Sequence, residues 1–192
     1  MSYWKKTDAG SAATDEFYDR PTLVFHWLTV LFVVALFGTS LVWNYLTPHD
    51  HFWRPLMEGT HVSLGILFAL LIVIRIIWRL TGMRRLAPEA GLSGTLSRMM
   101  YLILYVLLGA ETVLGFVLRW LQGEDFTFFG LFTVPALLAK DRASADIFEN
   151  LHNWVGWGIV ILSAGHAIAA LFHHYVLKDR VLQKMLWHRS YR

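Results

Sequence analysis

Six of the nine histidines in this 192-residue chain fall within or at the ends of long apolar stretches. Ionisable side chains inside apolar spans are costly and rare, so such histidines are candidates for function. Imidazole is a common ligand of transition metals, and it also titrates near neutral pH. We therefore expect metal or proton chemistry in an apolar environment. The six residues are His26, His61, His152, His166, His173 and His174.

Four of these histidines form two pairs at matched depths. His61 and His152 each follow a glutamate by three residues, near the same ends of their stretches. His166 comes 14 residues after His152, nearly four helical turns, so both lie on about the same face and about 21 Å apart. His26 lies near the opposite end of the first stretch. Two imidazoles on facing helices suit a six-coordinate b-type haem, which predicts an outer pair His61/His152 and an inner pair His26/His166.

Small residues surround these histidines, as in SAGHAIAA around His166 and GTHVSLG around His61. A flat porphyrin requires small neighbours, although Gly and Ala also serve ordinary helix packing in membranes. The chain has no cysteine. This excludes thiolate-held iron–sulfur clusters, zinc fingers and covalent c-type haem, and favours iron held by imidazole in non-covalent haem.

The composition indicates that membrane helices position the histidines. The chain is 56% hydrophobic and only 16% charged, against about 45–50% and about 25% in soluble domains. Four runs with few or no charged residues are long enough for helices that cross a bilayer of about 30 Å. Four buried helices of a soluble core are the alternative, but the chain has too little polar sequence to cover them. The runs are residues 21–49, 59–78, 99–118 and 150–177.

The remaining segments are predicted as loops and tails of an all-α, four-helix transmembrane bundle. Residues 126–139 are too short and too broken to span, so residues 122–149 are expected as a long outer, periplasmic loop with the apolar part at the membrane surface. The inner loop RRLAPEAGLSG is expected to be irregular. We expect one transmembrane dihaem domain over residues 21–178, between cytoplasmic tails at residues 1–20 and 179–192.

The charges predict the orientation. Of the 17 Lys and Arg residues, 13 fall on the side of the two termini, which the positive-inside rule places in the cytoplasm. The net charge of +3 is thus a topology signal, and nucleic acid is not an expected partner. The outer segments hold four basic residues against seven acidic ones. The basic ones are Arg54, Arg119, Lys140 and Arg142.

Several further residues are candidates with two interpretations. Arg75, 14 residues after His61, could pair with haem propionates or a quinone head group, or could extend to the membrane surface. His173 and His174 compete with His166 for the inner haem, but His173, 21 residues after His152, lies too far down to pair with His26, which favours His166. His173 or His174 would then suit proton delivery at an inner quinone site, or simply an interfacial position. Glu111 lies in mid-span, where it could bond to a neighbouring helix or belong to a proton path. The fragment around Asp50 (PHDHF) is interpreted as a solvated loop.

These motifs resemble one known family. They are His26–Trp27, an Arg-Pro-Leu ahead of His61, Arg75 at the foot of that span, FGLFTVP in the outer loop, and WVGWGIVILSAGHAIAALFHHY with a following Lys-Asp at Lys178. The chain is similar over residues 17–187 to the bacterial cytochrome b-561 family of dihaem inner-membrane proteins. The resemblance implies an outer haem held by His61 and His152 and an inner haem held by His26 and His166. Glu111 stands where the family would lead us to expect an apolar residue.

The resemblance also implies a function. It implies electron transfer in the respiratory chain, from periplasmic superoxide through two haems b to ubiquinone, as an oxidoreductase. The residues expected to gather superoxide are Arg54, Arg119 and Lys140, and those expected at the quinone site are His173, His174 and Lys178. A second hypothesis is a membrane anchor that relays electrons between quinone and a periplasmic dehydrogenase or hydrogenase. A third is a proton transporter or scaffold that uses Glu111 and the histidines.

Overall fold

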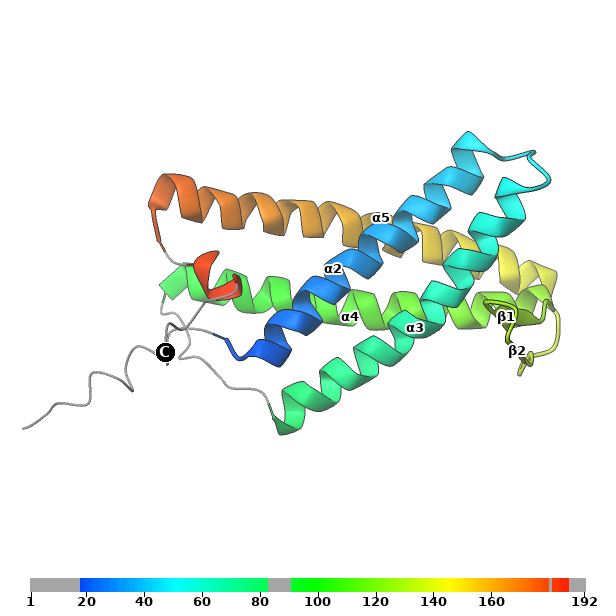
Figure 1. Cartoon of the computed structure of the whole chain (residues 1–192), viewed down its shortest axis with the longest axis horizontal. Coiled ribbons are helices and arrows are strands. Elements are labelled where there is room, and N and C mark those ends of the chain that lie inside the picture. The colour runs from blue at the N-terminus through cyan, green and yellow to red at the C-terminus, as the bar shows by residue number, and fades with distance from the viewer. Residues whose placement is uncertain (1–17, 83–90, 180, 187–192) are drawn as a thin grey trace, which may run out of the picture.

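A computed structural model of the chain describes residues 18–82, 91–179 and 181–186 (Figure 1). Most of the predicted N-terminal tail and of the predicted irregular inner loop, and half of the predicted C-terminal tail, therefore lie outside the described residues. The four apolar runs form four helices, each long and apolar enough to cross a membrane. These helices are α2 (Arg20–Leu41), α3 (Trp53–Thr81), α4 (Gly91–Gln122) and α5 (Arg142–Phe172).

Two of the long helices end in a wider π-helical turn. These are η1 (Val42–Leu46) after α2 and η2 (His173–Leu177) after α5. A short 3-10 turn, η3 (Gln183–Met185), follows. The Trp27 indole donates a hydrogen bond to the Met185 carbonyl at 3.0 Å, which fixes this C-terminal segment to the beginning of α2.

The helices form two antiparallel hairpins that cross each other. In Figure 1, α4 and α5 run along each other, while α2 and α3 run diagonally across them. Buried side chains from α3, α4 and α5 meet in the middle of the bundle, and partly buried aliphatic and aromatic residues of α2 complete this core. The buried members are Phe68, Leu71, Ile72, Leu108 and Ile159.

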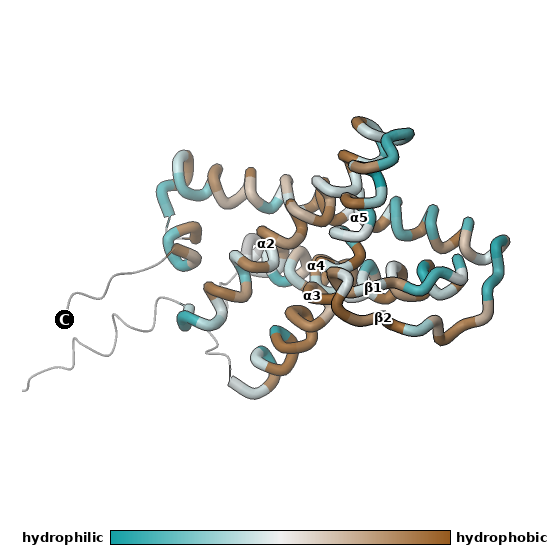
Figure 2. Tube along the Cα trace, turned by 45° about the vertical axis from the view of Figure 1, so that its right-hand side comes forward, coloured by the Kyte–Doolittle hydropathy of each residue, from teal (hydrophilic) through white to brown (hydrophobic). Residues whose placement is uncertain are grey.

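Most large apolar side chains outside this core are exposed, including Leu31, Val34, Trp154 and Ile161. Figure 2 shows hydrophobic residues along the helices, with hydrophilic ones gathered mainly toward the helix ends and loops. A chain with so much exposed apolar surface requires an apolar solvent. The lipid bilayer is such a solvent. Helices are stable in it, because they satisfy their backbone polar groups internally.

The predicted boundaries were too narrow for α3, α4 and the beginning of α5, whereas the first run, residues 21–49, extended past the observed helical end at Leu46. The sequence suggested a loop to residue 149, but α5 begins at Arg142. Asp141 caps this helix by accepting hydrogen bonds from the Ala143 amide and the Ser144 hydroxyl, at 3.2 and 2.6 Å. A search for charge-free runs misses such a start, because the first turns of α5 are polar.

The prediction of an entirely helical fold was also incomplete. Within the predicted outer loop, β1 (Phe126–Phe128) pairs with β2 (Phe132–Val134) in an antiparallel hairpin. Phe129 and Gly130 at its turn have φ values of +46° and +72°, a left-handed pair that matches the twist of a tight hairpin. Ser63 of α3 accepts a hydrogen bond from the Phe129 amide at 2.9 Å. The hairpin is thereby fixed to α3 two residues from His61.

Candidate functional site

The structure brings the predicted outer pair of histidines together. His61 of α3 and His152 of α5 face each other with ring centroids 6.2 Å apart and ring planes at 83°. Both side chains are largely buried. The indole of Trp43 packs edge-on against His61 at 4.9 Å, so the imidazole is held between aromatic and helical neighbours.

The orientation of His61 is fixed by its own hydrogen bond. Its Nδ1 lies 2.9 Å from the carbonyl oxygen of Leu36 on α2. A carbonyl can only accept, so Nδ1 carries the hydrogen and Nε2 is the nitrogen available to a metal. Metal-binding histidines usually donate their other ring N–H to a carbonyl or carboxylate in this way.

The predicted inner pair also meets. His26 of α2 and His166 of α5 have ring centroids 6.5 Å apart and ring planes at 69°. Residues Ala164 to Ala169, which include His166, are all exposed, and four of the six are Ala or Gly. This exposed stretch leaves room for a cofactor beside His166.

Both separations fit a single metal ion between two imidazoles. A transition-metal–imidazole bond is about 2.0–2.1 Å, and the ring centroid lies about 1.1 Å behind the nitrogen, so two axial rings have centroids about 6.3 Å apart. The observed values are 6.2 and 6.5 Å. In the described residues no group of three or more His, Cys, Asp or Glu side chains is arranged to hold a metal. Each site offers two protein ligands, which suits a metal whose other ligands come from a cofactor.

The sequence matches the family model described as prokaryotic cytochrome b561 over residues 17–188. The chain belongs to the prokaryotic cytochrome b561 family. This is a family of membrane electron-transfer proteins that bind b-type haem. The helical bundle and the two histidine pairs agree with that membership, and the assignment of the four histidines as haem ligands remains a prediction.

Individual cytochrome b561 relatives cover most of the chain. "Cytochrome b561 homolog 2" of Escherichia coli K12 is 35% identical over 184 residues, which is 90% of this chain and 93% of the relative. "Cytochrome b561 homolog 1" of the same organism is 28% identical over 176 residues, 90% and 98% of the two chains. "Probable superoxide oxidase CybB" of Yersinia pestis is 29% identical over 164 residues, 84% and 90%.

Arg75 lies inside this cytochrome bundle. Its Nε donates to the Tyr105 hydroxyl of α4 at 2.7 Å and its Nη1 to the Thr29 hydroxyl of α2 at 2.6 Å. These bonds join α2, α3 and α4, with Thr29 one helical turn from His26. Arg75 therefore does not extend to the membrane surface, which was the alternative interpretation of the sequence. A role of Arg75 toward haem propionates or quinone stays a prediction. Its two hydroxyl partners carried no signal in the sequence, because Thr and Tyr are common in spans.

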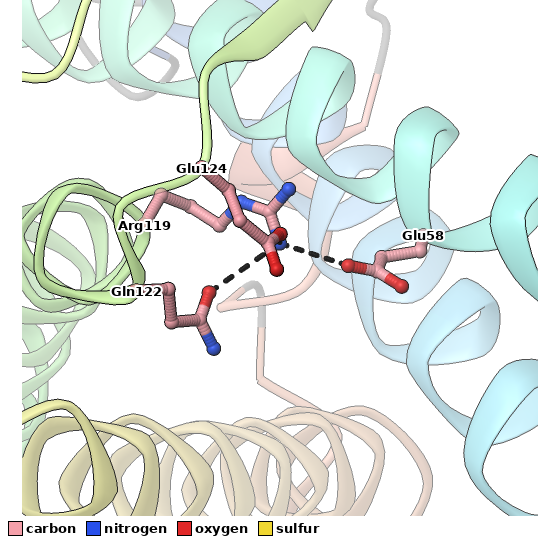
Figure 3. A network of polar contacts seen from close by, with 4 residues as sticks. All are labelled: Glu58, Arg119, Gln122 and Glu124. Carbon is pink, nitrogen blue, oxygen red and sulfur yellow. Dashed lines mark hydrogen bonds and ion pairs between the residues drawn. The ribbon is translucent and has the colours of Figure 1, made fainter. Parts of the chain in front are cut away.

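The three predicted outer cations have different environments. Arg119 at the end of α4 is 19% exposed and forms ion pairs with Glu58 of α3 at 2.8 Å and with Glu124 at 3.0 Å (Figure 3). Gln122 lies beside the same guanidinium at 3.4 Å. Most of the positive charge of Arg119 is therefore already balanced within the protein.

Arg54 and Lys140 are exposed at the same end of the bundle. Arg54 donates to the Pro48 carbonyl at 3.1 Å. The aliphatic part of Lys140 lies against Gly123, whose φ of +69° requires glycine and whose missing side chain leaves room for it. These two side chains present their charges to solvent, as a site that attracts anions requires.

The predicted quinone-site residues gather at the other end of α5. His173 and His174 form the first turn of η2, and Lys178 ends it in the left-handed conformation at φ +55°. This reversal brings Asp179 back to accept a hydrogen bond from His173 Nδ1. That bond and a second one from the Val181 amide hold the pKa of Asp179 below its usual range. The Asp179 carboxylate is therefore kept ionised and hydrogen-bonded to His173, just past the end of the span at Leu177.

Proposed function

We propose that this cytochrome b561 holds two haems b, one between His61 and His152 and one between His26 and His166, and moves electrons from periplasmic superoxide to ubiquinone. The observation that carries the proposal is the pair of facing imidazole couples at 6.2 and 6.5 Å on one bundle. When bound, the haems would supply a one-electron relay along the bundle axis.

The overall reaction balances with two superoxide anions for each quinone. Each superoxide loses one electron and leaves as dioxygen, and one ubiquinone takes up two electrons and two protons to become ubiquinol. Arg54 and Lys140 would attract the anion at the outer end. His173, oriented by Asp179, together with His174 and Lys178 would bind the quinone head group and pass protons to it.

This reaction requires a defined orientation in the bacterial inner membrane. Arg20 begins α2, Arg79 lies in the last turn of α3 and Arg98 lies in the first third of α4. The beginnings of α2 and α4 and the end of α3 lie at the end of the bundle opposite the β hairpin (Figure 1). By the positive-inside rule these ends would face the cytoplasm, and both termini with them. The haem pair nearer the hairpin would then be periplasmic.

A relay between the quinone pool and a periplasmic redox protein is the second candidate function. The ion-paired state of Arg119 and the excess of acidic residues at the outer end favour it. An acidic end would attract a basic protein partner and would repel superoxide, since steering depends on the sign of the surface charge.

Purified protein with a superoxide generator and a soluble ubiquinone analogue separates the two functions. The expected result is a reduced-minus-oxidised spectrum of b type with about two haems per chain, and quinol formation that superoxide dismutase abolishes. Arg54→Gln/Lys140→Gln is the informative double variant, since it should slow haem reduction by superoxide but leave reduction by dithionite unchanged. If superoxide dismutase leaves quinol formation unchanged, superoxide is not the electron donor, and the relay to a periplasmic redox protein is favoured. Absence of a b-type spectrum would reject both functions.

A further inference from the structure

A buried carboxylate lies beside one of the four candidate haem ligands. Glu111, in the middle of α4, has its Oε1 3.2 Å from Nδ1 of His152 on α5. The two side chains are only 19% and 21% exposed. Glu111 Oε2 and His152 Nδ1 are both buried and lack a hydrogen-bond partner among the described residues. Two unsatisfied polar atoms in one place require an explanation, because burying them without a partner is costly.

Two glycines make the space for this contact. A Cβ on Gly156 of α5 would lie 3.0 Å from Glu111 Oε1, and a Cβ on Gly115 of α4 would lie 3.3 Å from His152 Cε1. Both distances are tighter than most real Cβ contacts, so a side chain at either position would push its neighbour away by a few tenths of an ångström. The backbones of α4 and α5 thus leave a gap that the carboxylate and the imidazole fill.

The two outer histidines differ in what faces their Nδ1 atoms. His61 directs Nδ1 to a neutral backbone carbonyl, whereas the Nδ1 of His152 lies next to a carboxylate. If Nδ1 of His152 carries the hydrogen, Glu111 Oε1, at 3.2 Å, is the acceptor beside it. A carboxylate at this position fixes the ring and makes the imidazole a stronger donor to the metal.

We propose that Glu111 is a positioning residue for His152, which accepts the Nδ1–H hydrogen bond and thereby lowers the reduction potential of the outer haem. The proposal rests on the dihaem function proposed above. A stronger imidazole donor would stabilise the more positive, oxidised iron, so the reduced state would be disfavoured. The outer haem would then pass its electron inward more readily, because the inner pair lacks such a carboxylate among the contacts of the described residues.

The test is a potentiometric titration of purified holoprotein, followed in the visible spectrum. Glu111→Gln keeps the size of the side chain and removes the charge. The variant should retain two haems per chain. The equilibrium constant for reduction of the outer haem should rise at least tenfold, which raises its midpoint potential by 59 mV for a one-electron couple. The inner haem should not move. Glu111→Asp should restore part of the wild-type potential, and Thr112→Val, one residue away, serves as the matched control.

The outcomes separate this inference from the dihaem function. Two haems in the wild type with an unchanged outer potential in Glu111→Gln would overturn the role of Glu111 alone. An equal shift of both haems would overturn it as well, because a general change of the bundle would then be the cause. If Glu111→Gln binds no outer haem, retention in Glu111→Asp and Thr112→Val supports the role, and loss in Thr112→Val refutes it. A wild-type protein without an outer haem would reject the dihaem function itself.

Discussion

Replacement of His152 by alanine should remove one haem and leave the other. His152 supplies one of the two imidazoles of the outer pair, whose centroids are 6.2 Å apart, and alanine leaves His61 without a partner ring. A haem b has no covalent attachment, so the loss of an axial ligand should empty the outer position. We expect the haem content to fall from about two to about one per chain in a pyridine haemochrome assay.

The midpoint potential of the inner haem should change little, and its distance from the outer position sets the upper limit of that change. His166 lies 14 residues along α5 from His152, about 21 Å by the helix rise. A unit charge at that distance in a medium of effective dielectric constant 20 contributes about 0.8 kcal/mol, or roughly 35 mV for one electron. The midpoint potential of the remaining haem in His152→Ala should therefore lie within that range of the wild-type inner haem.

The control for this experiment is Asn153→Ala, because Asn153 is the exposed neighbour of His152 on the same helix. It should retain both haems and both potentials. Two haems retained in His152→Ala would refute the pairing of His152 with His61. Loss of both haems at unchanged helix content would refute the independence of the two positions.

The remaining predictions concern the groups around the pairs. Arg119→Gln should lower the free energy of unfolding by about 1–3 kcal/mol, because it breaks a part-buried link to Glu58, whereas exposed Arg54→Gln should not. Gly156→Ala should raise the outer haem potential by displacing the Glu111 carboxylate, whereas Gly158→Ala, with open space around it, should not. Asp50→Asn should make the melting temperature less sensitive to acid. The amides of Trp53 and Phe52 lower the pKa of Asp50, so the stabilisation from its ionised form is complete above the usual pKa of 3.8 and is lost as the pH falls through the folded pKa.

Each of these predictions has a contradicting result. Equal stability of Arg119→Gln and the wild type in denaturant would show that the ion pairs of Figure 3 add nothing to the fold. An unchanged outer potential in Gly156→Ala would mean that Glu111 adapts without leaving His152. Parallel acid melting curves of Asp50→Asn and the wild type would show that this carboxylate does not stabilise the beginning of α3.

Hydrophobic run length alone was sufficient to predict the number of spanning helices. A bilayer imposes a minimum length and excludes charges, and both constraints are visible in sequence. The polar ends were not predictable in the same way. The first turns of α5 and the hairpin around Gly130 depend on the Asp141 cap and on a left-handed turn, which short local motifs specify weakly.

The pairing of the histidines followed from helical arithmetic. The 14-residue spacing and the matched depths limited His26, His61, His152 and His166 to two couples, since a rigid helix fixes the rise per residue. The structure places the same two couples face to face. That these couples bind haem remains a prediction for the experiments above.

The sequence by itself determined which residues share a depth, because depth depends only on position along a helix. Only the tertiary structure decided what each side chain meets across the bundle. The direction in which two hairpins cross is set by packing between distant segments, and it brings Glu111 to His152, Arg75 to Tyr105, and Arg119 to Glu58. Such contacts depend on the rotation of each helix about its axis and on the crossing angle between helices, and neither can be predicted from a local sequence pattern.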